Sequence, residues 1–297
     1  MTRMVRRVGA TPQALHLAVS VTIIKGMAHW TLDDIPWDTF DRSKVDPEIV
    51  RIVKAASLVE QNGGDYTQYL CGVFHDDPAF QAVARRWGGE EVQHGQALGR
   101  WAMLADPSWD HAGAAERFTA GFRVNVAATR SLRGSRAGEL VSRCIVETGT
   151  SSYYTALYEA VEEPVLKIIC HNIAADELRH YKLFYTHMKR YLDIEGLNRF
   201  QRFRIAFQRM RDAEDDELAY AYYAANEGDA PYERRRYNGA YARRAIGVYR
   251  WHHVERAIAM GLKAAGLKPH GRLNMVAANV AWWGLQKRAA RLERIAA

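Results

Sequence analysis

The feature that most constrains this chain is a four-residue pattern that occurs twice. Residues 91–94 read Glu-Val-Gln-His and residues 177–180 read Glu-Leu-Arg-His, so both are Glu-x-x-His. A single glutamate precedes each pattern at nearly the same distance, Glu60 by 31 residues and Glu147 by 30. Positions i and i+3 lie on one face of an α-helix, so each pattern directs a carboxylate and an imidazole to the same side. The repeat therefore predicts two matching halves of one site.

Two helices with Glu-x-x-His, and one glutamate from each of two further helices, supply the ligands of di-iron carboxylate bundles. The predicted ligands are Glu60, Glu91, His94, Glu147, Glu177 and His180. Four inward carboxylates repel each other, and dehydrating each one costs several kcal/mol. Two divalent ions balance that charge. Oxygen-rich ligation with one imidazole per metal suits iron or manganese, and the sequence leaves zinc open.

The rest of the chain has the periodicity of consecutive helices. Asp46-Pro47 and Asp77-Pro78 are typical helix starts, and a third helix restarts at Pro164. We expect an intervening helix over residues 112–132, a helix over 139–161 that carries Glu147 and Thr150, and four helical pieces beyond residue 191. The tyrosines at 153, 154 and 158 are predicted to be packing residues rather than a radical site. A glycine pair at residues 63–64 weakens the helix just beyond Glu60, and we expect the helix to open or bend there.

No segment has the period of a strand. The predicted fold is therefore all-α, a ferritin-like four-helix bundle with a di-iron core, extended by additional N-terminal and C-terminal helices. We expect one domain over residues 1–297, with the metal-binding bundle at about 46–192 and the C-terminal extension at about 196–297. The extra N-terminal helix is predicted to begin at Pro12, as an amphipathic helix rather than a secretory signal.

Composition limits the compartment and the class of protein. The 297 residues are 48% hydrophobic and 25% charged, as in ordinary globular proteins. The three cysteines form no Cys-x-x-Cys pair, so neither a disulfide framework nor a zinc knuckle is indicated. No apolar run reaches the length of a membrane span. A reducing, cytoplasmic location fits these features best.

The formal net charge of +7 is unevenly distributed. Residues 231–297 contain fourteen Lys or Arg and three Asp or Glu, so the whole basic surplus belongs to the C-terminal part. A basic face attracts an acidic protein, an anionic lipid surface or a nucleic acid, and composition alone does not choose among them. An alternative is that these arginines only form a solvated face.

Several motifs resemble those of the soluble acyl-acyl carrier protein desaturases, the stearoyl-type enzymes of plant plastids and their bacterial relatives. The matching segments are EEVQHG at residues 90–95, ETGT at 147–150 and IAADELRH at 173–180. A weaker match is WTLDDIP at residues 30–36, taken together with Glu60 and Tyr66. The resemblance spans roughly residues 30 to 195. Gln93 replaces a common arginine of that family, the chain is shorter, and residues 196–297 contain no matching motif.

The resemblance implies that the six predicted ligands bind two iron ions (Fe2+/Fe3+). It places Thr150 on the O2-binding side of the iron pair, as a hydroxyl that hydrogen-bonds or passes a proton. It makes Asp176 the hydrogen-bond partner of a ligand histidine. It also implies that Asp176 and Trp30 lie on the route by which electrons reach the iron pair. Proteins of that family use O2 as co-substrate, remove two hydrogens from an acyl chain held as a carrier-protein thioester, and take electrons from ferredoxin.

The same resemblance implies a homodimer and an acidic acyl carrier protein as partner, and it gives no nucleic-acid partner. The electrostatics favour docking of this carrier on basic residues of the C-terminal part. The predicted docking residues are Arg234, Arg235, Arg236, Arg243 and Arg244.

Two other functions remain open at this stage. The same iron pair supports hydroxylation or N-oxygenation of a small metabolite, for which a short polar pocket is expected instead of a narrow apolar channel. A ferritin-like protein that oxidises or stores iron has no organic substrate, and Thr150 then has no special task. Such cages normally use a much shorter chain.

Overall fold

The computed structural model describes residues 29–212, 216–227 and 230–296. It divides into two compact units, Met1–Asp34 and Ile35–Ala297. In the first unit the described residues form one short 3-10 turn, Leu32–Asp34. The helix predicted to begin at Pro12 lies outside the described residues. That the chain forms a single domain stays a prediction.

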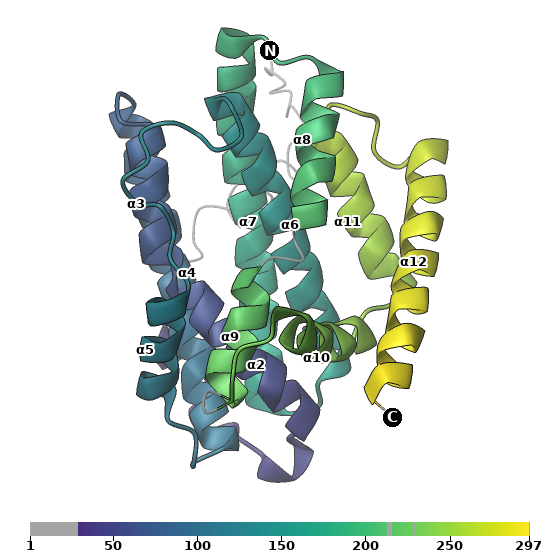
Figure 1. The fold of residues 1–297 in the computed structure, drawn as a ribbon. Coiled ribbons are helices and arrows are strands. Elements are labelled where there is room, and N and C mark those ends of the chain that lie inside the picture. Colours follow the sequence, from purple (N-terminus) through teal and green to yellow (C-terminus); the bar gives the residue numbers. More distant parts are fainter. Residues whose placement is uncertain (1–28, 213–215, 228–229, 297) are drawn as a thin grey trace, which may run out of the picture. The chain divides into compact units, whose positions relative to one another are not determined.

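The second unit is built from α-helices (Figure 1). They are α2 (Pro47–Gln61), α3 (Gly63–Val73), α4 (Pro78–Ala105), α5 (His111–Gly121), α6 (Arg136–Ala160), α7 (Pro164–Glu195), α8 (Arg199–Asp212), α9 (Asp216–Asn226), α10 (Arg234–Gly247), α11 (Trp251–Ala264) and α12 (Arg272–Ala296). Two 3-10 turns, Trp37–Thr39 and Arg42–Lys44, precede them. The described residues contain no strand, which confirms the all-α prediction.

The predicted helix starts are confirmed, and each is stabilised by a hydrogen bond between neighbouring residues. An acidic residue precedes proline at the beginning of α2, α4 and α7, and its carboxylate accepts a hydrogen bond from a backbone N–H of the first turn. The three acidic caps are Asp46, Asp77 and Glu163. Such caps satisfy donors that have no partner inside the helix, and proline tolerates the first helical position.

Two helix predictions are wrong in detail, and a third is confirmed. The helix expected over 112–132 ends at Gly121, because the following Val124, Asn125 and Val126 are poor helix formers. The expected opening of the first ligand helix at the glycine pair is confirmed, since α2 ends at Gln61 and α3 begins at Gly63. Beyond residue 191 the described part of the chain has five further helices, α8 to α12, where four were expected.

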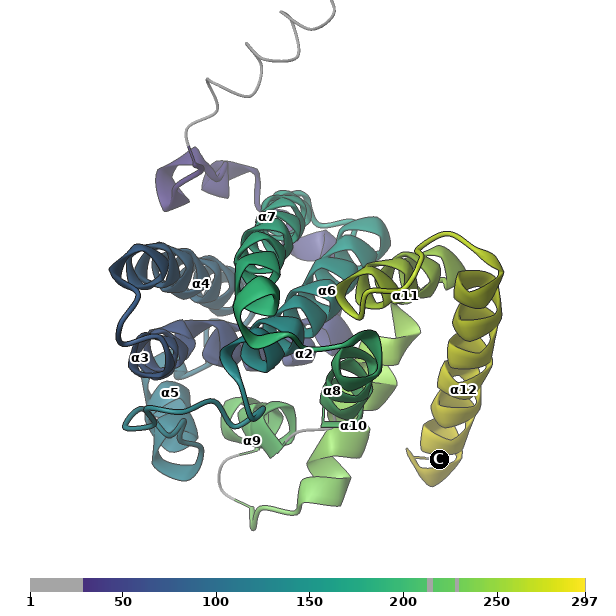
Figure 2. The same cartoon turned by 90° about the horizontal axis from the view of Figure 1, so that it is seen from above.

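The helices that carry the predicted ligands pack as a bundle. Helix α6 lies along α7, α2 lies along α4, and α4 contacts α7. Figure 2 shows α6 and α7 side by side, with α4 next to α7 and α11 on the other side of α6. The C-terminal helices cover this bundle, since α9 packs against α2, and α8 and α11 pack against α6. None of the described helices is long and apolar enough to cross a membrane.

A close helix crossing at Gly95 holds α4 against α2. A Cβ atom at Gly95 would lie 2.7 Å from the backbone nitrogen of Gln61 and 2.8 Å from the backbone oxygen of Ser57. Backbone atoms cannot rotate away, so a larger residue forces the two helices apart. We expect Gly95→Ala to lower the free energy of unfolding by about 1–3 kcal/mol, measured by urea denaturation of the metal-free protein.

The same helix provides a matched control for this prediction. A Cβ atom at Gly89 would meet nothing within 4 Å. Alanine is a better helix former than glycine, so Gly89→Ala should raise the free energy of unfolding by about 0.5–1 kcal/mol. Equal effects of the two substitutions would show that the crossing at Gly95 is not limiting.

Candidate metal centre

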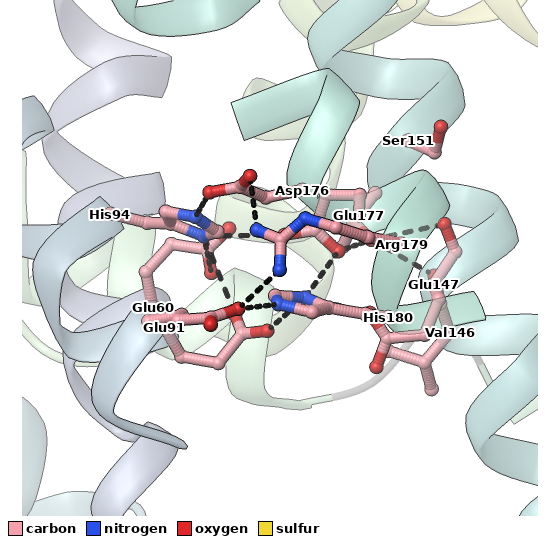
Figure 3. A network of polar contacts seen from close by, with 12 residues as sticks. Glu60, Glu91, His94, Val146, Glu147, Ser151, Asp176, Glu177, Arg179 and His180 are labelled. Carbon is pink, nitrogen blue, oxygen red and sulfur yellow. Dashed lines mark hydrogen bonds and ion pairs between the residues drawn. The ribbon is translucent and has the colours of Figure 1, made fainter. Parts of the chain in front are cut away.

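The six predicted ligands come together inside the bundle, one or two from each helix (Figure 3). Glu60 lies on α2, Glu147 on α6, and the Glu-x-x-His pairs lie on α4 and α7. All six side chains are buried, with exposed fractions between 0% and 7%. Four carboxylates and two imidazoles therefore share one water-poor region, although an uncompensated buried charge is expensive.

Their donor atoms form two overlapping groups, and within each group all donor atoms lie within 4.8 Å of one another. The first group is Glu60, Glu91, His94 and Glu177, and the second is Glu91, Glu147, Glu177 and His180. Glu91 and Glu177 belong to both groups. Each group adds one glutamate and one histidine of its own. Two adjacent metal positions that share two carboxylates fit this arrangement.

Oε1 of three ligand glutamates, Glu91, Glu147 and Glu177, is buried without a hydrogen-bond partner among the described residues. Nδ1 of His180 points into the same region, 3.0 Å from Glu91 and 3.7 Å from Glu147. Leaving a buried carboxylate oxygen without a partner costs free energy that a cation recovers. The donor set therefore fits metal ions, and the clusters alone do not choose which ion.

The outer nitrogen of each ligand histidine faces an acidic residue of the opposite helix. Nε2 of His94 lies 3.1 Å from Asp176 on α7, and Nε2 of His180 lies 2.7 Å from Glu90 on α4. Arg179 contacts both acids. Burial raises the pKa of Asp176, but hydrogen bonds from His94 and Arg179 outweigh this effect and lower that pKa to about 2. Ionised Asp176 therefore accepts a hydrogen bond from Nε2–H of His94, and in the neutral imidazole this leaves Nδ1 with a lone pair for a metal.

Sequence reasoning expected Asp176 beside a histidine but gave Glu90 no role. A signal was available, because an acidic residue stands directly before the glutamate of both Glu-x-x-His patterns. The histidine that each acid contacts depends on the packing of α4 against α7, and the sequence of either helix alone does not predict this packing.

Two hydroxyl groups of α6 contact carboxylates of the cluster. Thr150 Oγ1 donates a hydrogen bond to Glu177 Oε2 at 2.5 Å, so the structure places this residue beside the cluster. Tyr154 donates from its hydroxyl to Glu60 Oε1, also at 2.5 Å. Tyr154 was expected only to pack. Its signal was the helical spacing from Glu147 through Thr150 to Tyr154, which puts all three on one face.

The metal-free cluster retains protons. Burial, and then the charges of neighbouring carboxylates, raise the pKa of Glu60 and of Glu147 well above the usual range. Burial lowers the pKa values of His94 and His180. Hydrogen bonds to carboxylates outweigh this effect and raise both pKa values well above the usual range. A metal ion must displace these protons, since only neutral imidazole and ionised carboxylate bind it.

We therefore expect metal loading to release protons and metal affinity to increase from about pH 6 to about pH 8. Titration calorimetry in two buffers of different ionisation enthalpy measures the number of protons released. A Glu147→Gln variant should release fewer, because the amide has no proton to lose at that position. An affinity that does not change with pH would contradict the protonated cluster.

A third Glu/His group has the wrong tautomer for a metal site. Glu159, His252 and His253 lie close together. However, Nδ1 of His253 accepts a hydrogen bond from the backbone nitrogen of Arg250 at 3.0 Å. Neutral His253 therefore carries its proton on Nε2, the nitrogen that faces Glu159 at 3.2 Å. This group anchors the start of α11 to α6.

A pocket adjoins the cluster on the side of Thr150. A small cavity of about 80 Å³ is lined by Glu60, Glu91, Glu147 and Glu177. Beside it lies a pocket of about 310 Å³, lined mainly by apolar residues and tyrosines from α2, α6, α9 and α10. The site therefore has room for an organic molecule next to the carboxylates.

Comparison with known proteins does not assign this chain to a family. A scan against protein-family models found no match to this chain, and a search of the curated proteins found none either. The resemblance to the desaturases thus rests on the motifs quoted above.

Proposed function

We propose that this protein is an O2-dependent oxidoreductase with a di-iron centre. The observation that carries the proposal is the pair of four-residue groups that share Glu91 and Glu177. Two irons held in these groups are each provided with one histidine, one glutamate of their own and two shared carboxylates. When bound, such an iron pair supplies the electrons and the Lewis acidity needed to activate O2 for attack on an organic C–H bond.

The residues of the chain have distinct tasks in this proposal. Asp176 and Glu90 hold the two histidines so that Nδ1 points to the cluster. Tyr154 holds Glu60 in place. Thr150 lines both the pocket and the metal cavity. Its hydroxyl donates a hydrogen bond to Glu177 Oε2, which orients that carboxylate, and rotation about the Cβ–Oγ1 bond would direct the same O–H into the cavity.

The reaction implied by the resemblance is desaturation of an acyl chain. The substrate loses two hydrogens, a ferredoxin-type donor supplies two electrons, two protons enter from solvent, and O2 is reduced to two water molecules. The pocket beside Thr150 is the proposed place of the chain, because its lining is mainly apolar. We also propose the homodimer that the resemblance implies.

A second candidate, hydroxylation or N-oxygenation of a small metabolite, is favoured by one feature of the pocket. Arg209 and Glu217 line it together with the tyrosines, so it is not uniformly apolar. The mass of the product separates the two reactions, since desaturation removes two hydrogens and hydroxylation adds an oxygen atom. Product oxygen labelled from 18O2 would assign the second reaction.

We also propose docking of an acidic carrier protein on the C-terminal arginines. Fewer of these arginines are available to a carrier than their number in the sequence suggests. Four of the five predicted arginines have carboxylate partners within the chain. Arg243 and Arg244 both pair with Glu48, at 3.0 and 2.9 Å. A charge reversal at Arg235 that leaves carrier affinity and its salt dependence unchanged would count against docking there.

The test of the central proposal combines metal content with O2 chemistry. Protein purified anaerobically with Fe(II) should bind about two irons per chain. It should then consume O2 in the presence of an acyl substrate and a reductant, with a product detected by mass spectrometry. Many irons per chain and no organic product would indicate iron storage instead. A content near zero would overturn the metal site itself.

A further inference from the structure

Helix α8 carries a row of exposed apolar side chains, which we call the α8 stripe. It consists of Phe200, Phe203, Phe207 and Met210, whose exposed fractions lie between 42% and 75%. Spacings of three, four and three residues place them on one side of the helix. The rings of Phe203 and Phe207 stack on each other, with their centres 6.2 Å apart. At 1.5 Å per residue the stripe is about 15 Å long.

The opposite side of α8 is fixed to the bundle. The helix packs against α6 and α11 (Figure 1). Ala206 is buried, and the guanidinium group of Arg202 donates two hydrogen bonds, of 3.1 and 2.6 Å, to the backbone oxygen of Ala264 at the end of α11. The stripe therefore stays on the outer surface. Contiguous apolar surface of this kind is unusual on a monomeric protein and indicates an interaction site.

Arginines border the stripe. Helix α8 contains five arginines, no lysine and one acidic residue. Three of the arginines, Arg199, Arg204 and Arg211, are exposed. Each is four residues away from a phenylalanine of the stripe, so it lies beside the stripe on the helix surface. None of the three forms a salt bridge with a residue that the structure describes.

This combination of side chains has a known preference. A guanidinium group offers paired N–H donors that match two oxygens of a phosphate, and it keeps its charge at any physiological pH. Phenylalanine side chains gain free energy when they leave water. A helix that is apolar on one side and rich in arginine beside it lies flat in the surface of a bilayer, with its apolar side among the headgroups and its charges on lipid phosphates.

Further apolar side chains protrude at the same end of the bundle. Glu195 at the end of α7 accepts hydrogen bonds from the backbone nitrogens of Arg136 and Ala137 at the start of α6. The loop before α6 and the corner before α8 therefore lie close together. Leu132 in this loop and Ile194 before this corner are exposed by 76% and 71%. Apolar groups thus extend outward from two segments next to the stripe.

Other occupants fit these features less well than a lipid surface does. A protein partner must offer a surface that is complementary in shape to each protruding side chain, whereas a fluid layer of headgroups adapts to any arrangement. A second copy of this chain would bring the same arginines, and like charges oppose the contact of two such helices. The charge of α8 is complementary to a surface of anionic lipids.

We propose that the α8 stripe docks this protein on the surface of an anionic lipid bilayer, with the stripe inserted among the headgroups and Arg199, Arg204 and Arg211 bound to lipid phosphates. This inference goes beyond the proposed function. It requires no metal ion, because the residues that carry it lie on the outer side of α8.

The test measures binding of the full chain to vesicles by flotation. One set of vesicles is phosphatidylcholine alone, and the other contains about one third phosphatidylglycerol. The protein should bind the anionic vesicles at least about tenfold more tightly than the neutral ones, and the difference should shrink as the salt concentration rises.

Two double variants separate the apolar and the charged contributions. Phe203→Ser with Phe207→Ser keeps the charges and should weaken binding to anionic vesicles at least about tenfold at every salt concentration. Arg204→Gln with Arg211→Gln keeps the phenylalanines and should weaken binding about 10–30-fold at low salt, with a flatter salt dependence. All four side chains are exposed, so both variants should unfold at the temperature of the unaltered protein.

Helix α12 provides a matched control. Val276 and Val280 on α12 are exposed by 60% and 63%, but most basic residues of α12 follow residue 286. Val276→Ser with Val280→Ser removes a similar apolar area and should leave vesicle binding unchanged. An equal loss in this variant and in the phenylalanine variant would overturn docking through α8.

The remaining outcomes also decide the proposal. Equal binding to neutral and anionic vesicles, or unchanged binding in the phenylalanine variant, would overturn it. If that variant converted a dimer to a monomer, or lost retention on an acidic carrier protein, while no form bound vesicles, the stripe would be a protein interface instead. Metal-free and iron-loaded protein should bind vesicles alike, so failure of the O2 reaction leaves this inference testable on its own.

Discussion

Replacing Glu177 by alanine should abolish binding of both metal ions, whereas replacing Glu147 should remove one. The reason is that Glu177 belongs to both groups of donor atoms and Glu147 to only one. After Glu177→Ala each position keeps one histidine and two carboxylates, so both metal ions lose a charged ligand at once. Metal content after anaerobic loading with Fe(II) should fall from about two per chain to near zero in the first variant and to about one in the second.

The chain contains a matched control in the third Glu/His group. Glu159 lies beside two histidines, as the proposed ligands do, but the tautomer of His253 excludes it from a metal site. Glu159→Ala should therefore leave the metal content unchanged. Equal losses in Glu147→Ala and Glu177→Ala would contradict the shared role of Glu177. A loss in Glu159→Ala would place the metal elsewhere.

Removing the acid behind either histidine should weaken metal binding about 10–100-fold without removing any ligand. Glu90→Ala takes away the acceptor for Nε2 of His180, and Asp176→Ala takes away the acceptor for Nε2 of His94. Each change frees the imidazole to rotate or to adopt the other tautomer, so Nδ1 no longer points steadily at the metal. The affinity is measured by competition with a chelator of known strength.

A glutamate on the surface serves as control for this second prediction. Glu116 on α5 is exposed and belongs to none of the Glu/His groups. Glu116→Ala should change neither affinity nor thermal stability. If Glu90→Ala behaved in the same way, the contact at 2.7 Å would have no part in metal binding.

The sequence allowed the helix starts and the composition of the cluster to be predicted because both depend on local geometry. An acidic residue before proline determines where α2 and α4 begin, whatever packs against them later. The spacing of Glu91 and His94 makes them face one way in any helix. A second copy of that spacing at Glu177 removes most of the chance that the first is accidental.

Features that depend on how helices lie against each other were not predictable in this way. The contact between Glu90 and His180 requires the register of α4 against α7. The pocket of about 310 Å³ draws its walls from five helices and the connection between α10 and α11, and residues such as Tyr241 and Tyr249 have no motif around them. The end of α5 at Gly121 and the number of C-terminal helices depend on weak propensities that tertiary packing decides.

Helices α4 and α7 each supply the acid that faces the ligand histidine of the other, and this affects the order of helix docking and metal binding. Neither the α2–α4 pair nor the α6–α7 pair holds a complete metal position, since both shared carboxylates and both outer acids come from opposite pairs. Metal-binding free energy therefore becomes available only after the two helix pairs have docked. An ion that binds only the docked state stabilises it in proportion to the logarithm of ion concentration over Kd. We therefore expect metal binding to favour correctly docked molecules over misdocked ones.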